Sequence, residues 1–258
     1  MVQPRTNIHG IQDSSIKDWF QDLPLVCRTL LTCYLVTGGL LLFGVLPVTR
    51  LYHAWSLELS LPIPELWRLL TNFLIIGRPS LNYLFNLVWL VQYGVSYEKS
   101  KFLGNAADAI TMAGWGMIFI LALDALVPMF FRSAFHGEAL IFMLLYLWSK
   151  QNPATQVSFF GVVKLQSMYL PFAMLAIDIA QGASPFTGIR GILAGHLYLF
   201  FTEVYPRMYG YTPIRTPLWL SRLVYRYGLG KVPVQQVKPV HPSNAGFRAF
   251  SGRGQRLS

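Results

Sequence analysis

Residues 61–77 have the sequence LPIPELWRLLTNFLIIG and lie between two long apolar segments. Pro62 and Pro64 prevent a continuous helix from entering this stretch. Trp67 and Arg68 then follow among leucines, a mixture typical of a short segment at a membrane interface, where tryptophan lies at headgroup level and arginine reaches water. An ordinary interfacial anchor and a specific loop motif both fit these residues, so the rest of the chain must decide between them.

The composition predicts a membrane protein with several spans. Of 258 residues, 53% are hydrophobic and 12% charged, and the mean hydropathy is +0.43. A soluble domain has about 25% charged residues, so this chain has too few charges to cover a globule of its size. Cys27 and Cys33 fall six apart in one apolar segment, which makes a disulfide or a metal site between them implausible. We therefore expect neither a metal nor a cofactor.

The apolar runs predict an all-α fold with six transmembrane helices. These runs cover residues 25–47, 81–95, 106–128, 138–148, 159–179 and 189–204. The second and fourth runs are short, which predicts helix tilt or local thinning of the bilayer.

The chain divides into three parts. They are an N-terminal arm (1–24) with an amphipathic helix, a six-span domain (25–205) that includes the first loop (48–79), and a basic tail (206–258) with an interfacial helix at 218–227. From Pro206 onward there are nine Lys and Arg and no acidic residue. Because cytosolic loops are enriched in Lys and Arg, this bias predicts that both termini are cytosolic. Nucleic acid is not an expected partner.

Several polar residues fall inside the predicted spans, where such side chains normally face protein or water. Asn82 and Asn86 share one face of the second span, and Gln166 and Ser167 interrupt the fifth. Asp178 and Arg190 flank one loop, so they either pair with each other or extend to the interface.

The sixth span contains Gly191 and Gly195, whose spacing lets another helix approach closely. His196 follows directly and would need a nucleophilic serine across a helix interface to act as a general base. The fourth span has no serine between residues 138 and 148, and the chain contains no GxSG motif. We therefore predict no catalytic residue and no serine protease activity.

Three groups of motifs together resemble the Derlin family of rhomboid-like proteins. The first is PELWRLLTNF at residues 64–73, which is similar to the first-loop Trp-Arg motif and includes Asn72. The second is the ordered series Asn152-Pro, FFG at 159–161, Leu170-Pro171 and GILAGHLY at 191–198. The third is FSGRGQRL at 250–257, which resembles the SHP box that binds the valosin-containing AAA+ ATPase. Its matching positions are Phe250, Gly252, Gly254, Gln255 and Leu257.

The resemblance implies a rhomboid-like bundle in the endoplasmic reticulum membrane that lacks protease activity. It also implies a role in degradation of misfolded proteins, with a membrane ubiquitin ligase complex, the AAA+ ATPase, misfolded substrates and a possible second copy of the chain as partners. In this interpretation Trp67, Arg68 and Asn72 form a lumenal loop motif, and Asn82, Asn86, Gln166 and Ser167 line a polar lateral groove that moves substrate through a thinned bilayer.

The alternatives belong to other classes of protein. A scaffold that only joins ligase and ATPase stays open on sequence grounds. An active rhomboid protease lacks its serine, and a secondary transporter would show repeated halves, which residues 25–128 and 138–204 do not.

Overall fold

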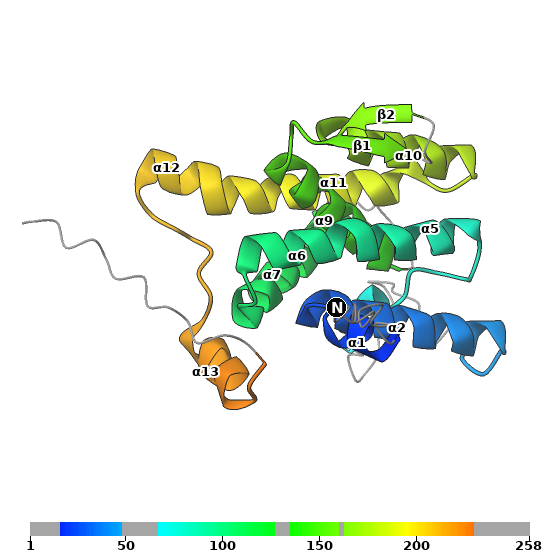
Figure 1. Cartoon of the computed structure of the whole chain (residues 1–258), viewed down its shortest axis with the longest axis horizontal. Coiled ribbons are helices and arrows are strands. Elements are labelled where there is room, and N and C mark those ends of the chain that lie inside the picture. Colours follow the sequence, from blue (N-terminus) through cyan, green and yellow to red (C-terminus); the bar gives the residue numbers. More distant parts are fainter. Residues whose placement is uncertain (1–15, 48–66, 127–134, 160–162, 230–258) are drawn as a thin grey trace, which may run out of the picture.

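The computed structural model describes residues 16–47, 67–126, 135–159 and 163–229, and helices form most of this part of the chain. Figure 1 shows the long helices running side by side in one bundle. In chain order the elements are α1 (Ile16–Gln21), α2 (Leu25–Leu42), α4 (Arg68–Thr71), the 3-10 turn η2 (Asn72–Leu74), α5 (Leu81–Trp89), the π-helix η3 (Leu90–Gly94), α6 (Val95–Phe102), α7 (Ala106–Leu126), α9 (Gly137–Gln151), β1 (Gln156–Phe159), β2 (Val163–Gln166), the 3-10 turn η4 (Ser167–Tyr169), α10 (Leu170–Ala180), α11 (Pro185–Leu199), the π-helix η5 (Phe200–Val204), α12 (Tyr205–Tyr209) and α13 (Leu218–Arg226).

Two ends of the bundle serve as reference points (Figure 1). We call the end where α6 meets α7, beside which α13 lies, the α13 end. The opposite end is where α4 precedes α5 and where α9 begins.

The central helix is α9, of which 12 of 15 residues are buried. The helical run α5–η3–α6, together with α7, α10 and α11, packs around it. Lipid also accepts an apolar helix, so it is the packing of the neighbouring helices, above all the close contact with α11, that places α9 at the centre.

The closest approach in the bundle is between α9 and α11. A Cβ atom on Gly191 would overlap the backbone oxygen of Ala139, and one on Gly195 would lie 2.9 Å from the ring of Tyr146. Gly188, one turn earlier, faces Phe142 in the same way. Small residues therefore let the two helix backbones come within contact distance.

The start of α2 is capped by a side chain from a distant helix. Its N-cap residue, Pro24, makes no side-chain hydrogen bond. Instead the buried carboxylate of Glu98 on α6 accepts hydrogen bonds from the amides of Val26 (2.9 Å) and Cys27 (2.8 Å). A negative charge at this position complements the helix dipole, so Glu98 ties α2 to the end of the α5–α6 run.

Two expected boundaries were wrong. The second helical run does not stop at residue 95 but continues through η3 and α6 to Phe102. The predicted fifth span, 159–179, begins instead as an antiparallel hairpin in which Val157 pairs with Leu165, and its helix starts only at Leu170. The hairpin ends at Gln166, and Pro171 then occupies the first turn of α10, where proline is well tolerated.

Within the described residues, α2 and α7 are long and apolar enough to cross a membrane. α10 and the 3-10 turn before it form a shorter apolar helix. The mostly helical fold agrees with the expected class, while the count of six spans and the location of the termini stay predictions.

Helices form in both segments predicted to lie on the membrane surface, and their position at an interface stays a prediction. α1 exposes Ile16 and Trp19. α13 buries Leu220 and Val224 against Ala106 and Ala107 at the start of α7. Its residues Trp219 and Leu223 are exposed beside Arg222 and Arg226.

We predict that Gly191→Ala lowers the stability of the bundle by about 1–3 kcal/mol, because the Ala139 carbonyl is backbone and cannot move aside. Gly114→Ala on α7 is the matched control, since a Cβ there meets nothing within 4 Å. Thermal unfolding of the detergent-solubilised protein, followed by tryptophan fluorescence, measures both. Equal midpoints for the two variants would show that the α9–α11 contact tolerates a wider separation.

Candidate functional site

The end of the first loop is clamped between α2 and α9. The backbone carbonyls of Asn72 and Ile75 accept hydrogen bonds from the amides of His136 and Gly137, both at 3.2 Å. From the other side, Thr37 on α2 donates to the carbonyl of Leu74 at 3.1 Å. A Cβ on Gly137 would overlap the Ile75 oxygen, so α9 must begin with glycine for the loop to dock.

The Trp-Arg motif places its aromatic ring outward. Trp67 is 55% exposed, whereas Asn72 and Phe73 are fully buried. The Phe73 ring meets His136 edge-on, with centroids 5.3 Å apart. The amide group of Asn72 makes no hydrogen bond. Residues 48–66, the first part of the predicted loop, lie outside the described residues.

A buried ion pair joins α7 to α11 at the same end of the bundle, the one where α9 begins. Arg190 Nη1 lies 2.8 Å from Asp124 Oδ1, and the two side chains are 0% and 2% exposed. Of the two alternatives left open for Arg190, neither holds: it is buried, and it pairs with Asp124 rather than with Asp178, because α11 directs the guanidinium toward α7.

Asp178 instead faces Glu138, at the start of α9. The side chain of Asn82 on α5 lies beside the Glu138 carboxyl. Five helices thus each bring one polar side chain to this end of the bundle: Asn82, Asp124, Glu138, Asp178 and Arg190. The sequence reasoning passed over Glu138, although an acid inside a short apolar run is itself a signal. In the described part of the chain, no group of three or more His, Cys, Asp or Glu is arranged to hold a metal.

His196 makes a hydrogen bond with a tyrosine of α9. Its Nδ1 atom is 2.9 Å from the hydroxyl of Tyr146 on α9. The serine of α9, Ser149, is buried and donates to the carbonyl of Tyr146 at 2.7 Å. His196 therefore takes part in helix packing through Tyr146.

The four residues expected to line one polar groove lie in two separate places. Asn82 and Asn86 are on α5, with the Asn86 amide donating to Asn82 at 3.0 Å. Ser167 lies at the other end of α9, where it donates to the Asn152 carbonyl, and Gln166 is exposed beside it. The structure thus does not bring the two pairs together.

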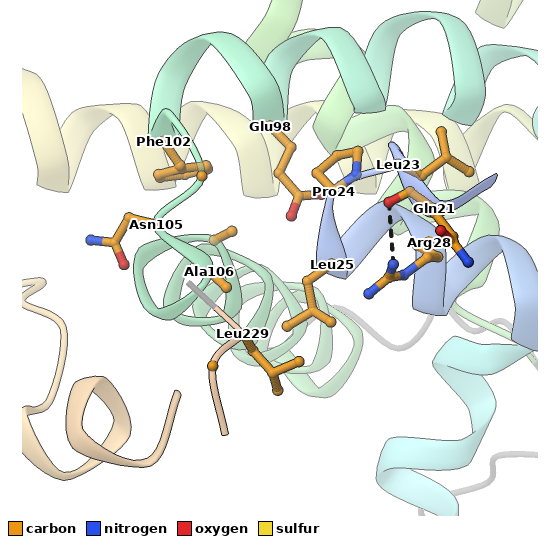
Figure 2. Close-up of a pocket in the computed structure, with 13 residues that line it drawn as sticks. Gln21, Leu23, Pro24, Leu25, Arg28, Glu98, Phe102, Asn105, Ala106 and Leu229 are labelled. Carbon is orange, nitrogen blue, oxygen red and sulfur yellow. Dashed lines mark hydrogen bonds between the residues drawn. The ribbon is translucent and has the colours of Figure 1, made fainter. Parts of the chain in front are cut away.

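A cavity of about 270 Å³ lies at the α13 end, between the start of α2 and the turn from α6 to α7. Figure 2 shows Gln21, Arg28, Glu98 and Leu229 around it. Arg28 donates to the Gln21 carbonyl at 3.4 Å, and Glu98 is engaged in capping α2. The polar groups of this cavity therefore already serve the fold.

The fold and site define a class of helical membrane protein. Its marks are a docked loop that follows the Trp-Arg motif, a close contact of α9 with α11 through glycines, and a histidine that makes a hydrogen bond with a tyrosine. The Der1-like family model matches residues 23–218, and the chain belongs to this family.

The protein is similar over most of its length to plant Derlins. It is 35% identical to Derlin-1.1 of Zea mays over 250 residues, which is 95% of this chain and 99% of the relative. It is 36% identical to Derlin-1 of Oryza sativa subsp. japonica over 249 residues, again covering 95% and 99% of the two chains. Derlin-1 of Arabidopsis thaliana is 37% identical over 226 residues, 87% of this chain and 83% of that one. The resemblance carried by the motifs is thereby confirmed.

We predict that Asp124→Asn or Arg190→Met alone lowers the free energy of unfolding by about 3 kcal/mol, because each leaves an uncompensated charge in the bundle. The double variant Asp124→Leu/Arg190→Met should recover at least half of that loss, since it removes both charges. Unfolding in mixed micelles of increasing SDS content gives these free energies.

The control is the surface pair of Lys99 and Asp22, whose side chains are 46% and 78% exposed. Lys99→Gln should cost no more than about 1 kcal/mol. A double variant whose loss equals the sum of the two single losses would mean that Arg190 and Asp124 stabilise the bundle independently.

Proposed function

We propose that this protein is a component of endoplasmic-reticulum-associated degradation that helps misfolded lumenal or membrane proteins return to the cytosol. In this proposal it lies in the endoplasmic reticulum membrane with both termini cytosolic, and it has no protease activity. Membership of the Der1-like family supports the proposal, as do three features of the structure.

The observation that carries the proposal is the shortness of an outer helix of the bundle. The 3-10 turn η4 (3 residues) and α10 (11 residues) form one apolar helix, Ser167–Ala180, on which Phe172 and Ile179 are exposed. At a rise of 1.5 Å per residue this helix extends only ~21 Å, less than the ~30 Å hydrocarbon core. Helices shorter than the bilayer draw it thinner around them, which shortens the path of a polypeptide through lipid.

Polar groups at both ends of α9 provide a second support. A chain crossing lipid exposes backbone groups that each cost several kcal/mol when left without a hydrogen bond. Asn82 is partly exposed at the opposite end and Gln166 is exposed near the α13 end. Asn86 and Ser167 are fully buried, and they donate to Asn82 and to the Asn152 carbonyl. We infer that Asn82, held by Asn86, and Gln166 are two separate polar sites on a lateral groove rather than one continuous lining.

The surroundings of His196 provide the third structural support, which concerns the lack of protease activity. His196 Nδ1 makes a hydrogen bond with the Tyr146 hydroxyl, and Ser149 is buried and donates a hydrogen bond to the backbone. A general base needs its nucleophile within hydrogen-bond reach, so a protease mechanism would require these helices to repack.

The tail supplies the proposed link to energy-driven extraction. Phe250, Gly252, Gly254, Gln255 and Leu257 resemble an SHP box and lie outside the described residues. We propose that this segment binds the valosin-containing AAA+ ATPase, while the membrane domain associates with a ubiquitin ligase complex. A scaffold that joins these partners without moving substrate is the competing function.

Reconstitution into proteoliposomes tests the transport role directly. A fluorescent misfolded substrate should pass from the lumen to the outside when the ATPase is present, and Asn82→Leu/Asn86→Leu should slow this passage at least about fivefold, because hydrogen-bond partners are lost along the path. Trp67→Ala should also slow passage without lowering the unfolding midpoint, since its ring is largely exposed.

Gln92→Leu is the control, because Gln92 is an exposed polar residue on the same helical run. Its passage rate should equal that of wild type. If wild-type protein moves no substrate but still recruits ligase and ATPase together, the scaffold function is correct and the transport proposal fails.

The tail is tested by a pull-down of the ATPase with full-length protein. Phe250→Ala/Leu257→Ala should reduce capture at least about tenfold, because aromatic and aliphatic anchors carry most of the energy of such contacts. Arg253→Ala/Arg256→Ala separates charge from anchoring and should reduce capture less. Undiminished capture by the Phe250/Leu257 variant would place the binding elsewhere in the chain.

A further inference from the structure

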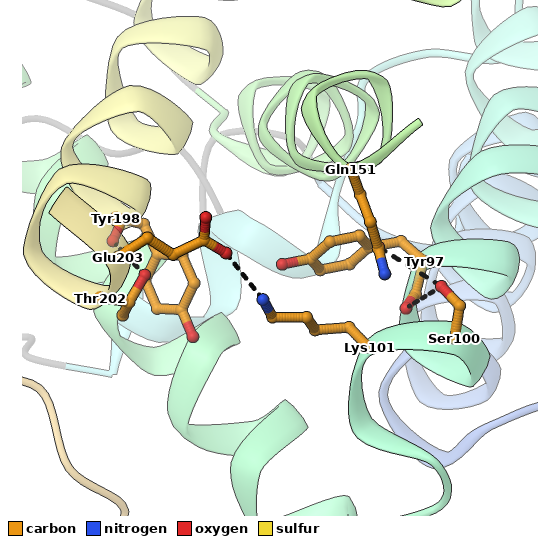
Figure 3. Close-up of polar contacts among 7 residues, drawn as sticks. All are labelled: Tyr97, Ser100, Lys101, Gln151, Tyr198, Thr202 and Glu203. Carbon is orange, nitrogen blue, oxygen red and sulfur yellow. Dashed lines mark hydrogen bonds and ion pairs between the residues drawn. The ribbon is translucent and has the colours of Figure 1, made fainter. Parts of the chain in front are cut away.

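A second cavity, of about 250 Å³, lies at the α13 end between α6, the last turn of α9 and η5. Figure 3 shows the polar groups that gather there from these three elements. Of the groups drawn there, Tyr97, Lys101, Gln151 and Glu203 line the cavity, and Lys150, which the figure does not draw, lines it as well.

Tyr97 provides the first sign of a ligand. The residue is only 1% exposed, and its hydroxyl makes no hydrogen bond to any of the described residues. In Figure 3 the hydroxyl points toward the space beside Lys101 and Glu203. A buried hydroxyl without a partner is unfavourable, so a ligand oxygen at this point would satisfy it.

The lysines give the cavity its charge. Lys101 Nζ lies 2.7 Å from Glu203 Oε1, and these side chains are 37% and 40% exposed. Lys150 Nζ is held 5.4 Å from the centroid of the Tyr146 ring. Two lysines against one glutamate leave a net charge of +1 in the cavity, which matches the single negative charge of a phosphodiester. If an anion displaced Glu203 from Lys101, both lysines could face it, and their two charges would match the doubly charged phosphomonoester.

The backbone is irregular on two of the helices that meet here. η3 precedes Tyr97 and Lys101, and η5 contains Glu203. A π-helical turn inserts a residue and changes the direction of the side chains that follow, and such turns are frequent at functional sites.

The neighbouring surface favours a lipid over a free ion. Phe200 and Val204 are exposed on η5, three residues before and one residue after Glu203. Leu147 and Leu199 add apolar surface to the lining of the cavity. An acyl chain could lie on exposed apolar side chains of η5 while its headgroup enters the cavity, whereas a free phosphate would gain nothing from them.

We propose that this cavity binds the phosphate group of an anionic phospholipid. Lys101 and the Tyr97 hydroxyl donate to the phosphate oxygens, Lys150 adds charge, and Glu203 competes with the phosphate for Lys101. The site is separate from the Trp-Arg loop, and binding of the phospholipid does not depend on substrate transport.

Isothermal titration of the full-length protein in detergent tests the site. The probes are dioctanoyl phosphatidic acid, dioctanoyl phosphatidylcholine and inorganic phosphate. Wild type should bind phosphatidic acid at least about tenfold more tightly than phosphatidylcholine, because the acid is more negative and its phosphate is unobstructed. Inorganic phosphate should bind far more weakly, since it lacks acyl chains.

Three variants change the site in different directions. Lys101→Gln should weaken phosphatidic acid binding about tenfold or more. Tyr97→Phe should weaken it several-fold without changing the charge. Glu203→Gln should strengthen it, because the competing carboxylate is gone. This last gain of affinity cannot result from a damaged fold.

Lys99→Gln is the matched control, since it removes an equal charge two residues away, where Lys99 pairs with Asp22. The affinity of the Lys99→Gln variant for phosphatidic acid should equal that of wild type. The proposal is overturned if Lys99→Gln weakens binding as much as Lys101→Gln, if Glu203→Gln weakens it, or if phosphatidic acid and phosphatidylcholine bind alike. Inorganic phosphate binding as tightly as the lipid would overturn the lipid assignment.

Discussion

The rest of the bundle depends on the contact between α9 and α11. Gly188, Gly191 and Gly195 face Phe142, the Ala139 carbonyl and Tyr146, so the two helix backbones approach as closely as atoms allow. Because lipid is as apolar as leucine, packing of this kind is a main force that joins helices in a membrane. With α9 enclosed on every side, the first loop can clamp onto its start and His196 can reach Tyr146 near its end.

Polar groups complete the assembly by joining helices that are distant in sequence. Arg190 and Asp124 connect α11 to α7, and Glu98 caps α2 from α6. Where water is scarce, a charge left alone would be costly, so each contact also fixes the relative position of two helices. The Tyr97 hydroxyl differs from these groups because it has no hydrogen-bond partner among the described residues, and this is the basis of the proposed phospholipid site.

Much of the architecture could be predicted because it follows from local patterns. The apolar runs located the main helices, and the absence of any serine between residues 138 and 148 argued against a protease. Family membership was also readable, because the motifs around Trp67 and Gly191 occur in a specific order. The hairpin at Gln156–Gln166 was missed, since a short apolar segment with a few polar residues fits a membrane helix equally well.

The sequence by itself determined the class of protein, the small residues of the helix contact and the short central helix, because composition and spacing depend only on the order of residues. Only the tertiary structure decided which polar groups meet. Arg190 binds Asp124, 66 positions away, rather than Asp178, which is nearer in sequence. Asn82 and Asn86 lie at the other end of α9 from Ser167. The reason is geometric: partners across a bundle depend on the rotation and register of each helix, and packing of all the helices together sets these.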